Sequence, residues 1–486
     1  MSPHAPSVAG VDESAESSEK DDREPGWLTQ ASLFIVVAIQ GADMKLLSSS
    51  MKALQQDIGV TLTDIGYMAM AQMITTTGAA PLWGILADRG TLTRRTILVA
   101  ACLGQGLVTM LLALVSDMAS MVLLRMLNGM LLAALRPIAN GIIADATTEN
   151  KQGRIFGRVT SGFLLGMLAT TVTVVPVATE EVMGFHGWRV AWVVVGLISV
   201  LVAGVVFCCL EEPPCKPATT TLPQGCAAVG AELKTLWSFF TVLTFCVLVV
   251  KGVFEAIPHT VFGNLILFLQ LAGVDNGKVV AVMTAHFLAA AAGVGLGGRV
   301  GDCLAGRIGV GGRPLTSQLS LAFNVPLTCG MLLGGAPNSG NFWLYLVLVT
   351  LRGLLGTWTN CGTNYPIVTH IVPALSRTRV MAWGTAIEDS IAAAVGPILL
   401  AQLAERAFGY DFGAAKGRRP RSAADDISSA EALGKALATT ICIPMILAFA
   451  LTSLLYWSYP RDIRKLQQQQ QQEQELTDKE PSAGVA

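Results

Sequence analysis

Apolar residues in this chain gather into long segments, and polar residues gather into the stretches between them. Each apolar segment holds about 20 residues, which is enough for a helix to cross a bilayer. The spans of the first half are predicted near residues 27–47, 63–87, 96–115, 119–144, 155–178 and 188–210. Those of the second half are predicted near residues 237–269, 278–301, 314–335, 341–370, 380–404 and 433–458. The pattern predicts an all-α polytopic membrane protein with about twelve transmembrane helices in two pseudo-symmetric six-helix bundles.

The polar stretches divide the chain into five parts. Residues 1–25 are rich in Ser, Asp and Glu, and we predict a disordered, acidic, cytosolic N-terminus. Residues 26–210 and 236–460 are the predicted N-terminal and C-terminal six-helix bundles, joined by a proline-rich cytosolic linker at 211–235. The tail, 461–486, carries a run of glutamines followed by acidic residues, and we predict that it is disordered and cytosolic.

Lys and Arg in the short loops predict the orientation in the membrane, because such residues are retained on the cytosolic side. Arg94 and Arg95 follow the second span and Arg377 follows the tenth, all on the side of both termini. We therefore predict an integral, multi-pass membrane protein with both termini in the cytosol. The loop 405–432 carries basic residues on the opposite side, but long loops weigh less in this rule.

Composition agrees with a membrane location and argues against several other classes of protein. The sequence is 52% apolar and 14% charged, whereas soluble domains are about 25% charged. Its formal net charge of −1 gives no basis for a nucleic-acid partner. The ten cysteines show neither CxxC nor Cys/His spacing, so we expect no disulfide framework, no metal and no cofactor. The expected partners are the lipid bilayer, a small-molecule substrate and a proton or other coupling ion, and we expect a monomer.

A motif at the end of the second span recurs at the end of the eighth. Gly84 and Asp88 stand four residues apart, and Gly298 and Asp302 repeat that spacing 214 residues later. Repeated motifs of this kind indicate that the two halves are copies of one unit. Basic residues accompany both copies, namely Arg89, Arg94 and Arg95 after the first and Arg299, Arg307 and Arg313 in or after the second.

A second motif recurs with a similar offset. Arg125-x-x-x-Gly129 lies in the fourth span, and Arg352-x-x-x-Gly356 follows 227 residues later in the tenth. Together with the Gly-x-x-x-Asp-Arg loop, these residues make the chain resemble the major facilitator superfamily of secondary transporters over roughly residues 28–460. The fifth span lacks the Gly-Pro pair that is typical of the drug/proton exchangers in that family.

The resemblance implies that the repeated Gly-x-x-x-Asp loops act as a conformational latch between the two halves. Asp88 and Asp302 each sit at a helix end, where a carboxylate can accept hydrogen bonds from a neighbouring helix N-terminus and pair with the loop arginines. The alternative is that these carboxylates contact substrate. Their place at the membrane edge favours the latch.

Cationic residues inside the spans are candidate substrate contacts, because charge within the hydrocarbon core is costly. Arg136 is the first choice, since it lies near the middle of the fourth span, directly before Pro137. The resemblance implies that spans one, four, seven and ten line a central cavity. The alternative is that Arg136 pairs with a carboxylate to fix packing. Arg125, Arg352 and Lys251 are further candidates, although the two arginines could instead reach the outer headgroups.

Titratable groups inside the spans are candidates for proton or ion coupling. Lys251, Glu255 and His259 are spaced at i, i+4 in the seventh span and share one helix face. The 214-residue offset puts Asp43 of the first span at a similar depth. The alternative is an intrahelical Lys–Glu pair that only tolerates burial. The remaining coupling candidates, which have no partner adjacent in sequence, are Glu388 and Asp389.

These features predict a secondary active transporter that moves a small organic solute by alternating access. The cationic residues favour an anion as substrate, and a gradient would supply the energy because the chain contains no P-loop. Gly293-x-Gly295-x-x-Gly298 matches a dinucleotide fingerprint, but it lies in an apolar span, where glycines allow close helix packing. We expect no enzymatic activity. The alternative function is a transporter-like membrane sensor or scaffold that moves nothing.

Overall fold

The computed structural model describes residues 26–88, 92–146, 149–211, 240–334, 341–372, 377–411 and 423–479 of the 486-residue chain. The predicted disordered N-terminus, Arg89 and nearly all of the predicted linker lie outside these residues. The chain forms two compact units, Met1–Leu47 with Thr75–Thr219 and Ser48–Ile74 with Thr220–Ala486.

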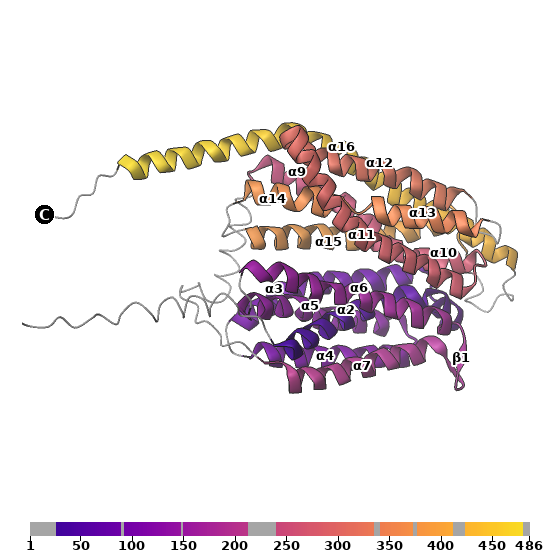
Figure 1. Ribbon diagram of the computed structural model, residues 1–486. Coiled ribbons are helices and arrows are strands. Elements are labelled where there is room, and N and C mark those ends of the chain that lie inside the picture. The colour runs from indigo at the N-terminus through magenta and orange to yellow at the C-terminus, as the bar shows by residue number, and fades with distance from the viewer. Residues whose placement is uncertain are drawn as a thin grey trace, which may run out of the picture. The chain divides into compact units, whose positions relative to one another are not determined.

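The first unit is built from helices and one short hairpin (Figure 1). Its helices are α2 (Trp27–Asp57), α3 (Leu62–Asp88), α4 (Arg94–Leu114), α5 (Met118–Ala146), α6 (Glu149–Val177) and α7 (Gly187–Cys209). The ends of α2 and α3 nearest to each other in sequence, 48–57 and 62–74, belong to the second unit. Strands β1 (Glu181–Val182) and β2 (Phe185–His186) pair antiparallel just before α7. Helix α4 packs along both α5 and α7.

The second unit contains helices that are interrupted as well as continuous ones. Its elements are α9 (Leu243–Val261), η1 (Phe262–Asn264), α10 (Leu265–Leu271), α11 (Asn276–Ile308), η2 (Gly309–Gly311), α12 (Gly312–Leu333), α13 (Phe342–Leu355), η3 (Asn360–Asn364), α14 (Tyr365–Ile371), α15 (Arg377–Gln402), η5 (Leu403–Ala407) and α16 (Ala423–Lys479). Helix α9 packs against α15 and α16, and α11 packs against α13.

The predicted spans correspond to observed helices. Within the described residues, nine stretches are long and apolar enough to cross a membrane, and one of them, Asn276–Leu333, contains both α11 and α12. Helices α3 and α6 fall at the predicted second and fifth spans. The turns before the second and eighth spans also repeat, because Gly59 and Gly273 both adopt positive φ, at 71° and 77°. The prediction of an all-α, multi-span fold is confirmed.

Glycines allow close helix contacts in each unit, but not all of those expected. A Cβ on Gly162 of α6 would lie 2.6 Å from the backbone oxygen of Phe34 in α2, and one on Gly166 would meet the backbone oxygen of Ala38. These two glycines therefore allow α6 to pack closely against α2. In α11 the expectation of close packing is met at Gly293 but corrected at Gly295 and Gly298, where added Cβ atoms meet nothing within 4 Å. The close contacts come from the i, i+4 series Gly293, Gly297 and Gly301, which faces α13 and η3.

The tenth predicted span is not one continuous helix. Helix α13 ends at Leu355, and the π-helical turn η3 follows before α14 begins. A π-helical turn changes which side chains face a neighbouring helix, and such turns are frequent at functional sites. The interruption therefore determines toward which neighbouring helices the side chains of Asn360 and Asn364 point. An uninterrupted α-helix would give these side chains other neighbours.

The last helix extends far beyond the predicted span 433–458. Helix α16 runs to Lys479, so the prediction of disorder from residue 461 is corrected over 461–479, while 480–486 lie outside the described residues (Figure 1). Gln, Glu and Lys are good helix formers, and extending an existing helix requires no new nucleation. Asp462 also holds the start of the extension, because its Oδ2 accepts hydrogen bonds from the Thr244 backbone N–H at 2.9 Å and hydroxyl at 2.8 Å.

Candidate functional site

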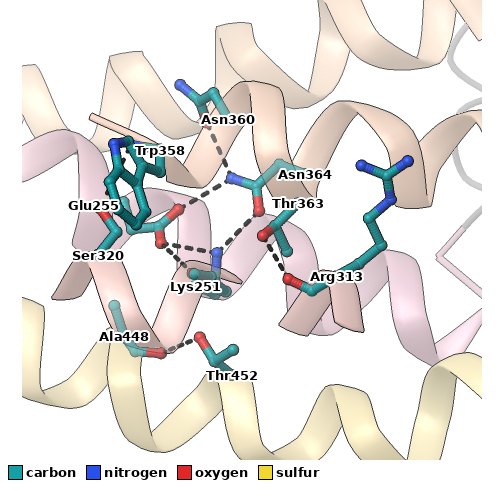
Figure 2. A network of polar contacts seen from close by, with 11 residues as sticks. Lys251, Glu255, Arg313, Ser320, Trp358, Asn360, Thr363, Asn364, Ala448 and Thr452 are labelled. Carbon is teal, nitrogen blue, oxygen red and sulfur yellow. Dashed lines mark hydrogen bonds and ion pairs between the residues drawn. The ribbon is translucent and has the colours of Figure 1, made fainter. Parts of the chain in front are cut away.

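A buried polar network in the second unit joins α9 to the interrupted segment after α13. Lys251 is 0% exposed and Glu255 is 7% exposed. The Lys251 Nζ lies 2.7 Å from Glu255 Oε1 and donates a hydrogen bond to Asn364 Oδ1 at 2.8 Å. Asn364 Nδ2 in turn donates to Glu255 Oε2 at 2.9 Å, which closes a three-membered network (Figure 2). Lys251 and Glu255 are thus paired along one helix face, as their spacing predicted.

The network borders a cavity that also contains the carboxyl groups of α15. Glu255, His259, Asn364, Glu388 and Asp389 are among its lining residues. The Lys251–Glu255 pair therefore faces a cavity with additional titratable groups, and four of the predicted coupling residues come together here.

Glu388 is held in this cavity mainly by packing. A Cβ added to Gly252 of α9 would overlap the Glu388 carboxyl group, so only glycine leaves room for that carboxyl group at this position. Among the described residues, Glu388 makes neither a hydrogen bond nor an ion pair. Its carboxyl group can therefore gain or lose a proton without breaking a structural contact.

In the first unit, Asp43 and Arg125 form a second buried cluster. Both side chains are 1% exposed, and Arg125 Nη1 lies 3.9 Å from Asp43 Oδ1. Asp43 Oδ2 accepts hydrogen bonds from the Thr109 hydroxyl at 2.6 Å and from Asn128 Nδ2 at 3.2 Å. The Arg125 guanidinium also lies 4.5 Å from the centre of the Trp192 ring. A predicted coupling residue and a predicted substrate residue are therefore direct partners.

Arg352 of α13 occupies the matching place in the second repeat and is also buried. It is 7% exposed, its Nε donates a hydrogen bond to the Thr328 hydroxyl at 3.1 Å, and its guanidinium lies 4.2 Å from the centre of the Phe262 ring. Neither Arg125 nor Arg352 extends to an outer surface, so headgroup contact does not explain them. Arg136, the first-choice substrate residue, is half-buried, with its guanidinium 4.3 Å from the Phe163 ring centre.

The second copy of the predicted latch contains an ion pair between Asp302 and Arg313, one of the arginines that accompany this motif. Arg313 Nη2 donates to Asp302 Oδ1 at 2.7 Å, and Arg313 Nη1 donates to the Gly362 backbone oxygen at 3.4 Å. Arg307 is exposed in the last turn of α11. Of the arginines that accompany the motif, the one that pairs with Asp302 lies at the start of α12, and linear spacing does not select it from the others.

The first copy of the latch is described only in part. The side chain of Asp88 lies outside the described set, as does the whole of Arg89. Arg94 lies beside Gly141 of α5, since a Cβ there would be 3.5 Å from the Arg94 guanidinium carbon. Arg95 lies over Phe207 of α7, at 4.8 Å from the ring centre. Added Cβ atoms at Gly84 and Gly298 meet nothing within 4 Å.

Several polar residues of these clusters were not singled out from the sequence. Asn364, Thr109 and Asn128 supply amide or hydroxyl groups to the two buried ion pairs. The presence of Asn inside apolar spans is the sequence signal that could identify such residues, because an amide group buried in hydrocarbon needs hydrogen-bond partners.

Buried ion pairs inside a duplicated set of apolar helices are typical of membrane transporters. The family model of the Major Facilitator Superfamily matches residues 33–397, so the chain belongs to that family. It is 26% identical over 211 residues to the 4-hydroxybenzoate transporter PcaK of Pseudomonas aeruginosa, covering 43% of this chain and 46% of that protein. It is 31% identical over 134 residues to the multidrug resistance protein MdtG of Escherichia coli, covering 28% and 31% respectively. The aligned region spans less than half the length of these relatives.

Solved structures show the same fold. A bacterial homologue of the human lysosomal transporter Spinster, in an inward-facing and occupied conformation, matches with a TM-score of 0.69 at 18% identity, over 89% of this chain and 97% of that one. A D-xylose–proton symporter matches with a TM-score of 0.65 at 13% identity, over 89% and 97%. The fold is that of the transporter family.

Proposed function

We propose that this protein is a secondary active transporter that moves a small organic anion by alternating access, coupled to protons. The observation that carries this proposal is the cavity beside Lys251 and Glu255, into which Glu388 brings a carboxyl group without a hydrogen-bond or ion-pair partner in the described part of the chain. Relatives described as transporters of 4-hydroxybenzoate and, with a proton, of D-xylose support a small organic solute.

Glu388 is the proposed proton carrier. Protonation removes one negative charge from a cavity that already contains the paired Glu255. A cavity with less negative charge accepts an anion more readily, so substrate and proton binding favour each other. Such coupling requires that protonation stabilise the two conformations of the transporter unequally.

The other predicted residues take supporting roles in this proposal. In the second unit, Lys251 provides positive charge beside the cavity, and His259 and Asp389 modulate coupling. In the first unit, Arg136 is the candidate for a substrate contact, and the Arg125–Asp43 pair is the candidate for coupling. The Asp302–Arg313 pair acts as a conformational latch, and Asp88 is the candidate latch residue of the first repeat.

Transport by the full-length protein in liposomes tests the proposal. A panel of organic acids that includes 4-hydroxybenzoate is offered with and without an inward proton gradient, and accumulation above equilibrium in the gradient is the expected result. Glu388→Gln should lose gradient-driven uptake but keep counterflow exchange, which needs no net proton movement. Glu431→Gln, at an exposed position of α16, is the matched control. Gradient-driven uptake by Glu388→Gln with unchanged pH dependence would assign coupling to another group.

A further inference from the structure

The equivalent arginines of the two repeats differ in whether an acidic side chain lies beside them. Arg125 has an acid beside it, because Asp43 lies 3.9 Å away and is itself held by Thr109 and Asn128. Arg352 stands 227 residues later in the repeated motif and is almost as deeply buried, at 7% exposure. Among the described residues, no carboxylate lies within ion-pair distance of Arg352. The second repeat therefore buries a cation without the acid that balances it in the first.

The contacts of Arg352 stabilise its charge only in part. Its place in the last turn of α13 puts it near the negative end of the helix dipole, and the Phe262 ring supplies a cation–π contact. Only Nε has a hydrogen-bond acceptor within the described chain, the Thr328 hydroxyl. The two terminal nitrogens, which form the fork that binds a carboxylate bidentately, have none there.

Tyr345 adds a second donor on the same helix face. It lies two turns before Arg352 on α13 and is 4% exposed, and its buried hydroxyl group has no hydrogen-bond partner among the described residues. Long helical side chains point back toward the helix N-terminus, so the Arg352 guanidinium extends in the direction of Tyr345. A buried hydroxyl without a partner costs free energy, which an acceptor placed between the two side chains would recover.

One wall of the cavity beside Glu388 lies close in sequence to the ring that contacts Arg352. His259 lines that cavity, and Phe262, whose ring contacts Arg352, follows His259 by three residues. A molecule in the cavity with an acidic group at one end can therefore extend toward Arg352 while its other end stays near Glu255 and Glu388.

We propose that Arg352 and Tyr345 bind the carboxylate of the transported solute, with the Arg352 fork and the Tyr345 hydroxyl donating to its oxygens. This inference rests on the proposed function and specifies its substrate class as carboxylic acids. The second repeat thus uses a substrate carboxylate where the first uses Asp43.

Binding to the purified full-length protein tests the inference without transport. Benzoate and acetate serve as carboxylate probes, and benzamide serves as a neutral probe of nearly the same shape as benzoate. The carboxylates should raise the melting temperature and should protect Arg352 from modification by phenylglyoxal, followed by mass spectrometry. Benzamide should do neither. Equal effects of benzoate and benzamide, or no effect of either carboxylate, overturn the proposal.

Tyr345→Phe separates a binding role from a structural one. The variant removes a hydroxyl without a partner in the described chain, so its stability without ligand should be equal or higher. Its benzoate affinity should fall about tenfold, as expected when a hydrogen bond to a charged group is lost. Tyr456→Phe, whose hydroxyl donates to Gln318 at 3.0 Å, should leave benzoate affinity unchanged. Unchanged benzoate affinity in Tyr345→Phe overturns the role of the hydroxyl.

Arg352→Lys provides an independent check and shows which proposal has failed. It keeps the charge but loses the planar fork, so benzoate affinity should fall while the folded protein is retained. If wild-type protein transports in liposomes but benzoate binding does not depend on Arg352, this site is wrong and the transport function stands. If benzoate binds as described but the gradient drives no organic acid in the panel, the transport function is wrong and the site stands.

Discussion

At the residue scale, pairing within one helix could be predicted from the sequence, and pairing between helices could not. Lys251 and Glu255 share a face of α9 because they are four residues apart, and the structure places them 2.7 Å apart. Asp43 and Arg125 lie on different helices, and nothing in their local sequence indicates that they meet. The same limit applies to Asp302, because the sequence indicated a pairing with a nearby arginine but not that the partner is Arg313 of α12.

The Lys251–Glu255 pair can be tested for a structural or a functional role. Lys251→Met leaves Glu255 buried without its cation, so the free energy of unfolding should fall by about 3–5 kcal/mol. Adding Glu255→Met should restore stability, because replacing both members of a buried pair by apolar residues is often neutral. Thermal unfolding of the three purified proteins gives the stabilities.

Transport by the double variant then decides between the two roles. A stable double variant without gradient-driven uptake means that the pair serves transport. A stable and fully active double variant means that the ion pair has no role in transport. Lys251 and Glu255 would then not belong to the functional site. Lys435→Met, at an exposed position of α16, controls for loss of a lysine.

At the element scale, apolar periodicity located the helices but not their interruptions or their real ends. The predicted spans 63–87 and 188–210 agree closely with α3 and α7. The π-helical turn after α13 was not predicted, because a window of span length averages over the short polar stretch Asn360–Asn364 and carries no signal for an extra residue. The extension of α16 was missed because a polar composition was interpreted as disorder, whereas its residues favour a helix that has already begun.

The contact between α11 and α12 gives a prediction about the latch. Asp302 is 73% exposed, so Asp302→Asn should change the stability by less than about 1 kcal/mol. Transport should nevertheless fall, because the pair favours one conformation in the proposed cycle. Arg313→Gln should have the same effect, and the double variant should be no worse than either single one. Accessibility of cysteines introduced near each membrane surface measures the shift in conformation.

The matched control for the latch is Arg307→Gln. Arg307 is exposed, and among the described residues it forms no ion pair with Asp302. Transport should be unchanged in this variant if Arg313 is the residue that forms the latch ion pair with Asp302. A larger loss in Arg307→Gln than in Arg313→Gln would return the role to the residue chosen from the sequence.

At the scale of the whole molecule, the repeats were the most informative feature of the sequence. The 214-residue offset that relates Gly59 to Gly273 relates two turns with the same unusual backbone conformation. The 227-residue offset relates two buried arginines. Repetition thus indicated the family and the equivalence of positions. It could not show that only one of the two arginines has an acid beside it, since that difference lies in Asp43 on another helix.

The length of α16 leads to a prediction about topology. A helix from Ala423 to Lys479 is about 85 Å long at the usual rise per residue, far more than the bilayer requires, so one or both of its ends extend beyond the membrane. The charge of the short loops predicts that both chain termini lie in the cytosol. Epitope tags within residues 1–25 and after Ala486 should therefore react only after the membrane is permeabilised, whereas a tag at Gly417, before α16, should react in intact cells. A Gly417 tag on the same side as both termini would mean that α16 or α15 does not cross the membrane. It would also take Glu388 and Asp389 of α15 out of the proposed transport path.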